Sequence, residues 1–462
     1  METQTPFDLQ QAIPQVLDGF CDWRRWMPAY ETDTTLAVSS ERWQVAFGAF
    51  QERLKDNYPF FHPLYAGQMI KPPHPVAVAG YLAAMLINPN NHALDGGPAT
   101  ARMEKECIQT FARQFGFTDG HIGHLTSGGT MANLEALWVA RELHPDRKII
   151  FAQNAHYTHE RMCCLLNAPY EKIPATPQGQ MDVSALEKLL KTEAQSVGTV
   201  VVTLGTTALG TLDPLAEVLK LKRQYGFRVH VDMAYGGYYH VLNEALSEFA
   251  EFGHVRHCDS VVIDPHKHGL QPYGCGCVIF ADPSVSALYR HESPYTYFTS
   301  PDEQHLGEIG LECSRPGATA AALWLTMQLF PLNADDGMGT ILRKTRQAAL
   351  RFASDLRDLK EYRLYLPPAL DIVTFFPLAD STTAISARTR MLFQAMMQSV
   401  DYPLYLATLS VAAEDFKALH PDIAVDSDTV TIFRSCLMKP EHADWAEPMA
   451  RYLEHHALML KH

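Results

Sequence analysis

The feature that most limits the possible folds is an alternation of two periodicities between residues 121 and 280. Short apolar runs alternate with amphipathic stretches such as MANLEALWVARELH and MDVSALEKLLKT. The apolar runs are HIGHL, KIIFAQ, VGTVVVTLGTT, RVHVD, DSVVID and GCVIF. Strands that are apolar throughout and separated by helices are typical of a parallel sheet covered on both faces. The alternation therefore predicts an α/β layer architecture.

The segments on either side of this alternation have a different character. Residues 1–60 resemble amphipathic helices rich in Trp, Phe and Leu, and they are too short to form a domain alone. We expect this N-terminal helical arm to pack on something larger, such as a second subunit. The alternation resumes weakly after about residue 331. We therefore predict a large domain over residues 61–330 and a small C-terminal α+β domain over residues 331–462.

The charge balance is acidic and limits the possible partners. Asp and Glu number 52 against 38 Lys and Arg, and no basic run is present. This composition argues against a nucleic-acid partner and favours a small molecule. The sequence shows no secretory signal pattern and no run of the roughly 18 apolar residues that a membrane span needs. We expect a cytoplasmic protein with reduced thiols and no metal site, since the nine cysteines form no C-x-x-C pair.

Small and polar residues follow the predicted strands, where ligands collect in open α/β sheets. The loop 126–130 (TSGGT) precedes a helix, a pattern typical of a phosphate cradle, although an ordinary turn explains it as well. The next strand offers His156 and His159, and a satisfied polar neighbour is the simpler interpretation of each. Residues 205–207 (GTT) are again small and hydroxylated, and turn chemistry alone explains them equally well.

Two charged side chains, Asp232 and Lys267, stand at the ends of apolar strands. Burying either one alone is costly, so each needs a partner. The two can pair with each other, or a cofactor can lie between them. A pyridine ring that carries a phosphate and an aldehyde would use the glycine-rich loop, a histidine to stack on it, the aspartate at its nitrogen and the lysine as a Schiff base. The strand ends together therefore predict pyridoxal phosphate.

The same motifs resemble those of the pyridoxal-phosphate-dependent group II amino-acid decarboxylases over residues 58–330. They are TSGGTMANLEAL, NAHYTHER, TLGTT, HVDMAYGG, DPHKHGLQPYGCG and CSRPGA, in that order. Residues 88–106 are most similar to the bacterial tyrosine decarboxylase branch. The resemblance implies the aspartate-aminotransferase-like fold, which is PLP fold type I, with a mostly parallel seven-stranded sheet and helices on both faces. It also implies an obligate homodimer with shared active sites.

The resemblance further implies roles for individual residues. Lys267 would form the Schiff base, Asp232 would bind the pyridinium nitrogen, and His156 would stack on the ring; these three are the predicted catalytic residues. Gly129 and Thr130 would hold the phosphate. The full cofactor-binding set that the resemblance implies is Gly129, Thr130, His156, Thr207, Asp232, Asp264, His266, Lys267 and Ser314. Within it, the serine would reach the phosphate from the partner subunit.

The implied activity is decarboxylation of an L-amino acid to the amine, and one departure bears on it. Relatives place a tyrosine on a loop near the dimer interface to help protonate the product. This sequence has no tyrosine between Tyr297 and Tyr362, and Phe330 or Met338 stands where one is expected. The resemblance associates a phenylalanine at that place with oxidative chemistry that yields an aldehyde.

An ordinary decarboxylase remains the favoured interpretation, with His156, His159 or Lys267 supplying the proton. The segment 57–69 (NYPFFHPLYAGQM) is rich in aromatic residues near the part of the chain that faces the substrate in relatives. It suits an aromatic, tyrosine-like substrate, although its rings can equally clamp the arm to the core. Aspartate and glutamate stay open as alternative substrates.

Overall fold

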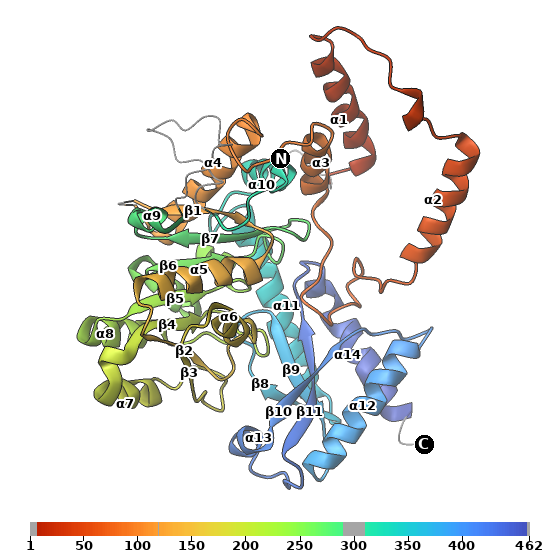
Figure 1. Cartoon of the computed structure of the whole chain (residues 1–462). Helices are drawn as coiled ribbons and strands as arrows, with labels where there is room; N and C mark the ends of the chain where they lie inside the picture. The colour runs from red at the N-terminus through yellow and green to blue at the C-terminus, as the bar shows by residue number, and fades with distance from the viewer. Residues whose placement is uncertain (1–6, 119, 290–309, 460–462) are drawn as a thin grey trace.

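The computed structural model describes residues 7–118, 120–289 and 310–459. A large sheet with helices around it lies beside a smaller sheet, and the N-terminal arm extends away from both (Figure 1). The helices are α1 Leu9–Arg24, α2 Ser40–Leu54, α3 Pro75–Met85, α4 Pro98–Phe115, α5 Gly129–Leu143, α6 Thr158–Leu166, α7 Val183–Glu193, α8 Leu215–Tyr225, α9 Ser286–Tyr289, α10 Gly317–Leu329, α11 Met338–Asp358, α12 Thr382–Gln398, α13 Ala413–Leu419 and α14 His442–Met459. The strands are β1 Ile122–Thr126, β2 Lys148–Ala152, β3 Tyr170–Ile173, β4 Val197–Thr203, β5 Arg228–Asp232, β6 Ser260–Ile263, β7 Gly276–Phe280, β8 Tyr362–Leu366, β9 Ile372–Pro377, β10 Ala407–Ala412 and β11 Thr429–Cys436.

The large sheet has seven strands in the order β1-β7-β6-β5-β4-β2-β3. Strands β3, β2, β4, β5 and β6 pair in parallel, whereas β7 is antiparallel to both of its neighbours. Every residue of β4 is buried, as expected for a strand covered on both faces. The predicted fold class, a mostly parallel sheet of seven strands, is confirmed.

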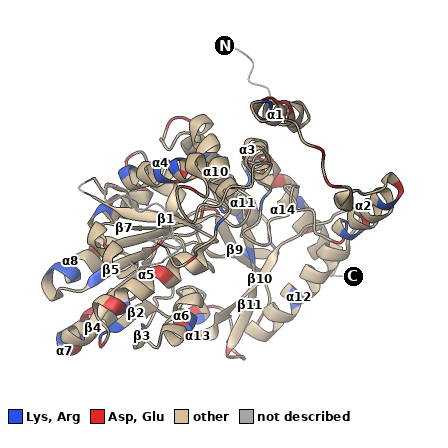
Figure 2. Cartoon of the chain, turned by 45° about the horizontal axis from the view of Figure 1, so that its top comes forward, with Lys and Arg blue, Asp and Glu red and all other residues tan. Residues whose placement is uncertain are grey.

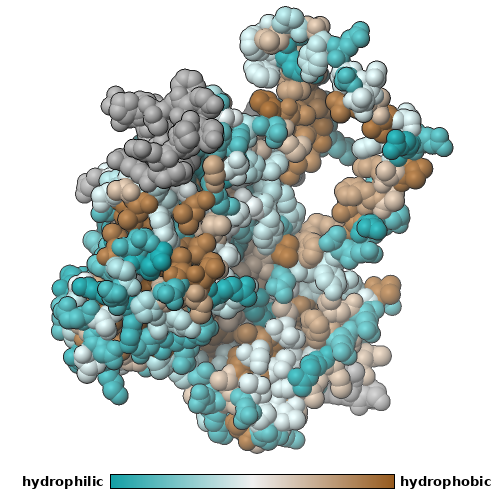
Figure 3. Space-filling model, in the orientation of Figure 1, coloured by the Kyte–Doolittle hydropathy of each residue, from teal (hydrophilic) through white to brown (hydrophobic). Residues whose placement is uncertain are grey.

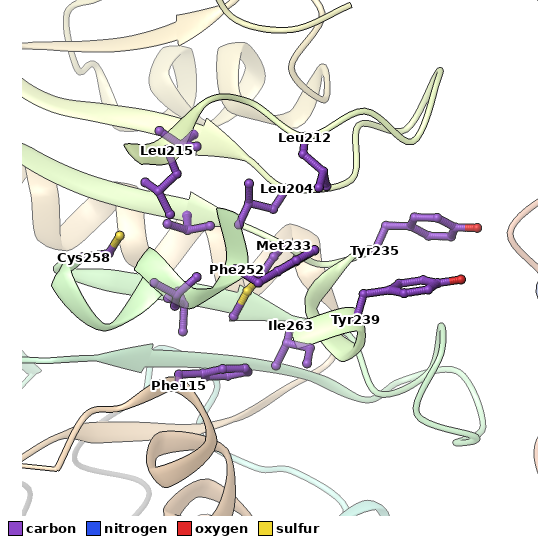
Figure 4. Close-up of a cluster of buried hydrophobic side chains, with 14 of the residues drawn as sticks. Phe115, Leu204, Leu212, Leu215, Met233, Tyr235, Tyr239, Phe252, Cys258 and Ile263 are labelled. Carbon is purple, nitrogen blue, oxygen red and sulfur yellow. The ribbon is translucent and has the colours of Figure 1, made fainter. Parts of the chain in front are cut away.

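Helices cover both faces of this sheet. Helix α5 packs on one face through Ala132, Ala136 and Val139. Helices α4, α7 and α8 contribute to the apolar core on the other face, part of which is shown in Figure 4. Because the parallel strands run in one direction, the loops that follow them meet at one edge of the sheet.

The small C-terminal sheet has four antiparallel strands in the order β10-β11-β9-β8. Helix α11 joins the two parts of the molecule: Leu342 belongs to the core of the large sheet, and Phe352 and Leu356 belong to the core of the small one. Strand β11 also brings Arg434 against the large sheet, where it donates to backbone carbonyls of the loop after β4. The domain boundary near residue 330 stays a prediction.

The N-terminal arm consists of α1 and α2, in line with the predicted amphipathic helices. Helix α1 lies against α3. None of residues 40–54, which form α2, is buried. In Figure 3 open space separates α2 from the body of the molecule, and apolar side chains show along α2. The apolar face of α2 therefore has no cover among the residues of its own chain that the structure describes.

Acidic and basic residues are interspersed along the helices in Figure 2. Among the helices that the structure describes, none is both long enough and apolar enough to cross a membrane.

Candidate active site

A cavity of about 380 Å³ opens at the edge of the large sheet where the parallel strands end. The loops after β1, β2, β4, β5 and β6 all contribute to its wall. The wall includes eight of the nine predicted cofactor residues, namely Gly129, Thr130, His156, Thr207, Asp232, Asp264, His266 and Lys267. The sheet topology thus brings residues between Ser127 and Lys267, 140 positions apart in the sequence, to one place.

The loop between β1 and α5 forms one wall of the cavity. Gly128 has φ 153°, within the range that favours glycine, and α5 begins at Gly129 without a side-chain cap. A Cβ atom on Gly129 would lie 2.6 Å from Oδ2 of Asp264, so the wall has no room for a side chain there. The uncapped N–H groups of the first turn and the positive end of this 15-residue helix suit an anion such as a phosphate.

Lys267 has Asp264, and not Asp232, as its carboxylate partner. Its Nζ atom lies 3.1 Å from Oδ2 of Asp264, and its backbone N–H donates to the carbonyl of the same residue at 2.9 Å. The interpretation in which Lys267 and Asp232 simply pair with each other is therefore wrong. The Oδ1 atom of Asp264 is buried and has no hydrogen-bond partner among the described residues.

Asp232 ends β5 and is held by His159. Its Oδ2 atom lies 2.9 Å from Nε2 of His159, and its Oδ1 atom accepts from the backbone N–H of Ala234 at 3.1 Å. Burial alone would raise the pKa of this carboxyl group, but the hydrogen bond and charge of His159, with the charge of Lys267, outweigh it. The net result is a pKa well below the ordinary value of an aspartate, so the group stays ionised.

Two predicted histidines line the cavity in defined orientations. The Nδ1 atom of His156 accepts from the backbone N–H of Thr158 at 3.3 Å, which leaves Nε2 to carry the ring proton. The Nδ1 atom of His266 lies 2.7 Å from the carbonyl oxygen of Cys275 and so carries a proton. Burial lowers the pKa of both rings, so both are neutral at neutral pH.

Thr207 and Ser314 are placed differently. Thr207 lines the cavity, and its carbonyl accepts from Nη2 of Arg434 at 2.6 Å. The side chain of Ser314 accepts from Nδ2 of Asn90 at 3.1 Å and does not line the cavity of its own chain. Its role toward a partner subunit stays a prediction.

The aromatic segment that precedes α3 forms a cluster outside this cavity. The ring centroids of Phe60 and Tyr65 lie 4.8 Å apart, and Tyr65 and Tyr58 lie 6.2 and 5.7 Å from Tyr405 of the small domain. None of these rings lines the cavity. The arrangement favours the interpretation that these rings clamp the start of the chain to the core.

The two residues at the expected tyrosine position also lie outside the cavity. Phe330 directly follows α10, with its ring 4.8 Å from that of His74, and Met338 is buried in the core of the large sheet. Tyr297 lies outside the described residues.

Sequence analysis missed three contributions. His159 is expected there only as a satisfied polar neighbour or a proton source, and neither Thr203 nor Tyr235, which also line the cavity, is included. The signal for both was available, since Thr203 is the last residue of β4 and Tyr235 stands in the HVDMAYGG motif.

These residues fit pyridoxal phosphate. The uncapped N-terminus of α5 suits its phosphate, the ionised Asp232 suits a protonated pyridine nitrogen, and Lys267 suits its aldehyde. The buried Oγ1 atom of Thr203, like Oδ1 of Asp264, has no hydrogen-bond partner among the described residues. Buried polar atoms without partners at the wall of a cavity indicate a polar ligand.

Comparisons with known proteins agree with this geometry. The model of the pyridoxal-dependent decarboxylase conserved domain matches residues 31–376. The L-tyrosine decarboxylase of Enterococcus faecium is 30% identical over 394 residues, and the match covers 64% of each of the two chains. The L-aspartate decarboxylase of Thermococcus kodakarensis is 29% identical over 332 residues, which is 70% of this chain and 82% of that one.

A solved structure has the same fold. The crystal structure of Oryza sativa TDC with PLP and tryptamine aligns over 100% of both chains with a TM-score of 0.78 and 17% identity. This likeness supports PLP fold type I, and the family match covers all the residues that line the cavity. The chain therefore belongs to the pyridoxal-dependent decarboxylase family.

Proposed function

We propose that the protein removes the α-carboxylate of an L-amino acid as CO2 and releases the amine, with pyridoxal phosphate as cofactor and a tyrosine-like substrate favoured. The observation that carries this proposal is the arrangement of one cavity. Lys267 lies there beside Asp264, and an ionised Asp232 is held by His159 in the same wall. Family membership supports the reaction class.

The cofactor, when bound, supplies a conjugated system that accepts the electron pair left when CO2 departs. The protein contributes a fixed electrostatic environment. The first-turn N–H groups of α5 would hold the phosphate, and Asp232 would favour a positive charge at the pyridine nitrogen. His159 fixes the orientation of that carboxylate, which makes it a positioning residue.

Lys267 is the proposed group that binds the cofactor covalently and then moves protons. Asp264 forms an ion pair with its ammonium group at 3.1 Å, and Lys267 lines the cavity beside it. His156 lines the same cavity as a neutral ring with its proton on Nε2. The Nε2 atom of His159 is already hydrogen-bonded to Asp232. Lys267 and His156 are therefore the better candidates for protonating the product at Cα.

The substrate is the less constrained part of the proposal. Relatives of similar identity are named for tyrosine and for aspartate. An aromatic substrate agrees with the tyrosine decarboxylase that matches at 30% identity. Aspartate or glutamate is the alternative substrate, and oxidative decarboxylation to an aldehyde is the alternative reaction.

A panel of L-amino acids, incubated with and without oxygen, tests substrate and reaction together. We expect equal amounts of amine and CO2 in both conditions, with tyrosine as the best substrate. Aldehyde, ammonia and peroxide that form only with oxygen would replace the proposed reaction with the oxidative one. Preferential turnover of aspartate or glutamate would replace the proposed substrate and keep the reaction.

We also propose that the protein acts as a cytoplasmic homodimer. Helix α2 exposes the side chains of Trp43, Phe47, Phe50 and Leu54, which share one face at helical spacing. Trp43 is 58% exposed and stacks on Phe47 at 5.0 Å between ring centroids. An apolar face of this kind needs a cover, and a second copy of the chain is the proposed one.

A further inference from the structure

We propose that His268 and Asp371 form a buried ion pair, with His268 protonated on both ring nitrogens, and that this pair positions the turn that carries Lys267. The proposal rests on the role proposed above for Lys267. His268 directly follows that lysine, and Asp371 directly precedes β9 of the small sheet. The pair would thus be a positioning device that the small domain supplies to the active site.

The hydrogen bonds around His268 define its protonation. Its Nε2 atom lies 2.7 Å from Oδ2 of Asp371, and its Nδ1 atom lies 2.9 Å from the backbone carbonyl of Tyr235. A carbonyl oxygen only accepts, so Nδ1 must carry a proton. An ionised carboxylate also only accepts, so Nε2 must carry the second. A ring that donates from both nitrogens is an imidazolium.

Asp371 is held in its ionised form. Its Oδ1 atom accepts from the hydroxyl of Tyr235 at 2.6 Å, so both of its oxygens receive a short hydrogen bond. Burial alone would raise the pKa of this carboxyl group, but the charge and hydrogen bonds of His268 and Tyr235 outweigh it. The resulting pKa lies below the ordinary value of an aspartate.

Burial makes the two charges depend on each other. His268 is 1% exposed and Asp371 is 0% exposed. The groups that face the ring are the two tyrosines of the 235–239 turn, with ring centroids at 4.6 Å for Tyr235 and 5.4 Å for Tyr239. Figure 4 shows both hydroxyls pointing away from the apolar cluster. Lys71 also interacts with the charge of Asp371, but removing either member of the pair would leave the other without its hydrogen-bonded counter-charge.

The surrounding contacts carry this restraint to the cofactor site. Tyr235 lies three positions after Asp232 and lines the cavity. The Nδ1 atom of His268 is hydrogen-bonded to the backbone carbonyl of the same tyrosine. The carboxylate of Asp371 therefore contacts both turns: it binds Tyr235 in the turn after Asp232 and His268 in the turn of Lys267. The Nζ atom of Lys71 adds a weak contact, 3.3 Å from the carbonyl of His268.

The backbone of the lysine turn indicates that it needs such a restraint. Leu270 has φ 66°, a left-handed conformation that side-chain-bearing residues rarely adopt. A strained conformation persists only where the surroundings fix it. The His268–Asp371 pair lies two residues from this strained position and fixes it from the opposite domain.

The experiment compares Asp371→Asn, His268→Gln and the double variant with Tyr362→Phe. Tyr362 is a matched control because it is also buried and its hydroxyl donates to a carbonyl, that of Leu453, within the small domain. Each holoprotein is examined for kcat, KM, thermal unfolding and the pH midpoint of the visible absorbance of the bound coenzyme. Reduction of the wild type with borohydride, followed by peptide mass spectrometry, checks separately that Lys267 binds the coenzyme.

We expect each single variant to lower kcat by about ten- to a hundredfold with KM changed less than about twofold, because misplaced reacting groups affect the chemical step. The pH midpoint of the absorbance should shift in both single variants. The kcat of the double variant should be little lower than that of either single variant. Tyr362→Phe should lower the unfolding temperature only. If a charge variant does not fold, Tyr235→Phe, which retains both charges, should shift kcat and the midpoint in the same direction.

A merely structural role would give a different result. In that case Asp371→Asn and His268→Gln would resemble Tyr362→Phe, with a lower unfolding temperature but the wild-type kcat and absorbance midpoint. That result would overturn the positioning role while leaving the proposed function intact. Failure of the wild type to carry the coenzyme on Lys267 would instead contradict the proposed function itself.

Discussion

The Nε2 atom of His159 lies 2.9 Å from the Oδ2 atom of Asp232, and the two side chains are 0% and 6% exposed. The histidine lies on α6 and the aspartate ends β5, so a helix and a strand of the large domain jointly orient the carboxylate proposed to face the pyridine nitrogen. This contact also explains how a carboxylate remains ionised at the end of a buried strand.

Replacing His159 tests this contact directly. We expect His159→Leu to lower kcat by about 10²-fold, since the carboxylate loses the donor that orients and stabilises it. His159→Gln, whose amide can still donate, should recover a large part of that loss. Steady-state kinetics and coenzyme affinity should be measured together, and equal activity of the two variants would contradict the role of the hydrogen bond.

The glycine at the start of α5 should be essential for coenzyme binding. A Cβ atom at Gly129 would meet Oδ2 of Asp264 at 2.6 Å, so Gly129→Ala should push apart the phosphate loop and the partner of Lys267. Overpacking of this kind typically costs about 1–3 kcal/mol, which corresponds to coenzyme binding weakened by about five- to 150-fold.

Gly253→Ala is the control for this substitution, because its nearest neighbour to a new Cβ is a side chain at 4.0 Å. Coenzyme titration of the apoproteins, followed by absorbance, gives the two dissociation constants. A Gly129→Ala variant that binds as tightly as the control would show that the loop has more freedom than the structure indicates.

The stability of the fold should decline in mild acid. Burial lowers the pKa of His442 to about 3, whereas an unfolded histidine titrates near 6.5. Between these values the unfolded chain binds a proton that the folded chain does not, so stability falls as the pH falls below about 6.5. One such histidine contributes a slope of about 1.4 kcal/mol per pH unit.

His442→Gln should reduce this slope. The comparison requires the free energy of unfolding of both proteins from denaturant titrations at about pH 7 and pH 5.5. We expect the loss of unfolding free energy between pH 7 and pH 5.5 to be smaller in the variant by about 1 kcal/mol. An unchanged difference would mean that His442 gains its proton without unfolding.

The apolar face of α2 should be needed for dimer formation. Trp43→Glu places a charge in the centre of that face, so we expect the variant to sediment as a monomer at concentrations where the unchanged protein is a dimer. Ala49→Glu adds the same charge to an exposed position on the opposite side of the same helix and should leave the dimer intact. Identical sedimentation of the two variants would place the interface elsewhere.

The sequence predicted the fold because it follows from local patterns, and eight of the nine predicted site residues line one cavity. Apolar runs separated by helices define a parallel sheet, and strand ends define where Asp232 and Lys267 meet. The family and the fold class are confirmed. Each loop carried its own signal, such as the two glycines before α5.

The pairing of these groups could not be predicted in the same way. Asp264 is only three residues from Lys267, but which carboxylate faces the lysine depends on how two turns pack together. The contact between His159 and Asp232 spans 73 positions, and that between His268 and Asp371 spans 103. Contacts of this range are set by the docking of sheet, helix and small domain, for which a single sequence holds no periodic signal.

The most direct test of the account concerns Lys267. Purified protein should be incubated with pyridoxal phosphate, reduced with borohydride, digested and analysed by mass spectrometry. We predict one pyridoxyl group on the wild-type peptide that contains Lys267 and no pyridoxyl group on the Lys267→Ala protein. A label on another lysine of the wild type, or no label at all, would contradict the assignment of this cavity as the cofactor site.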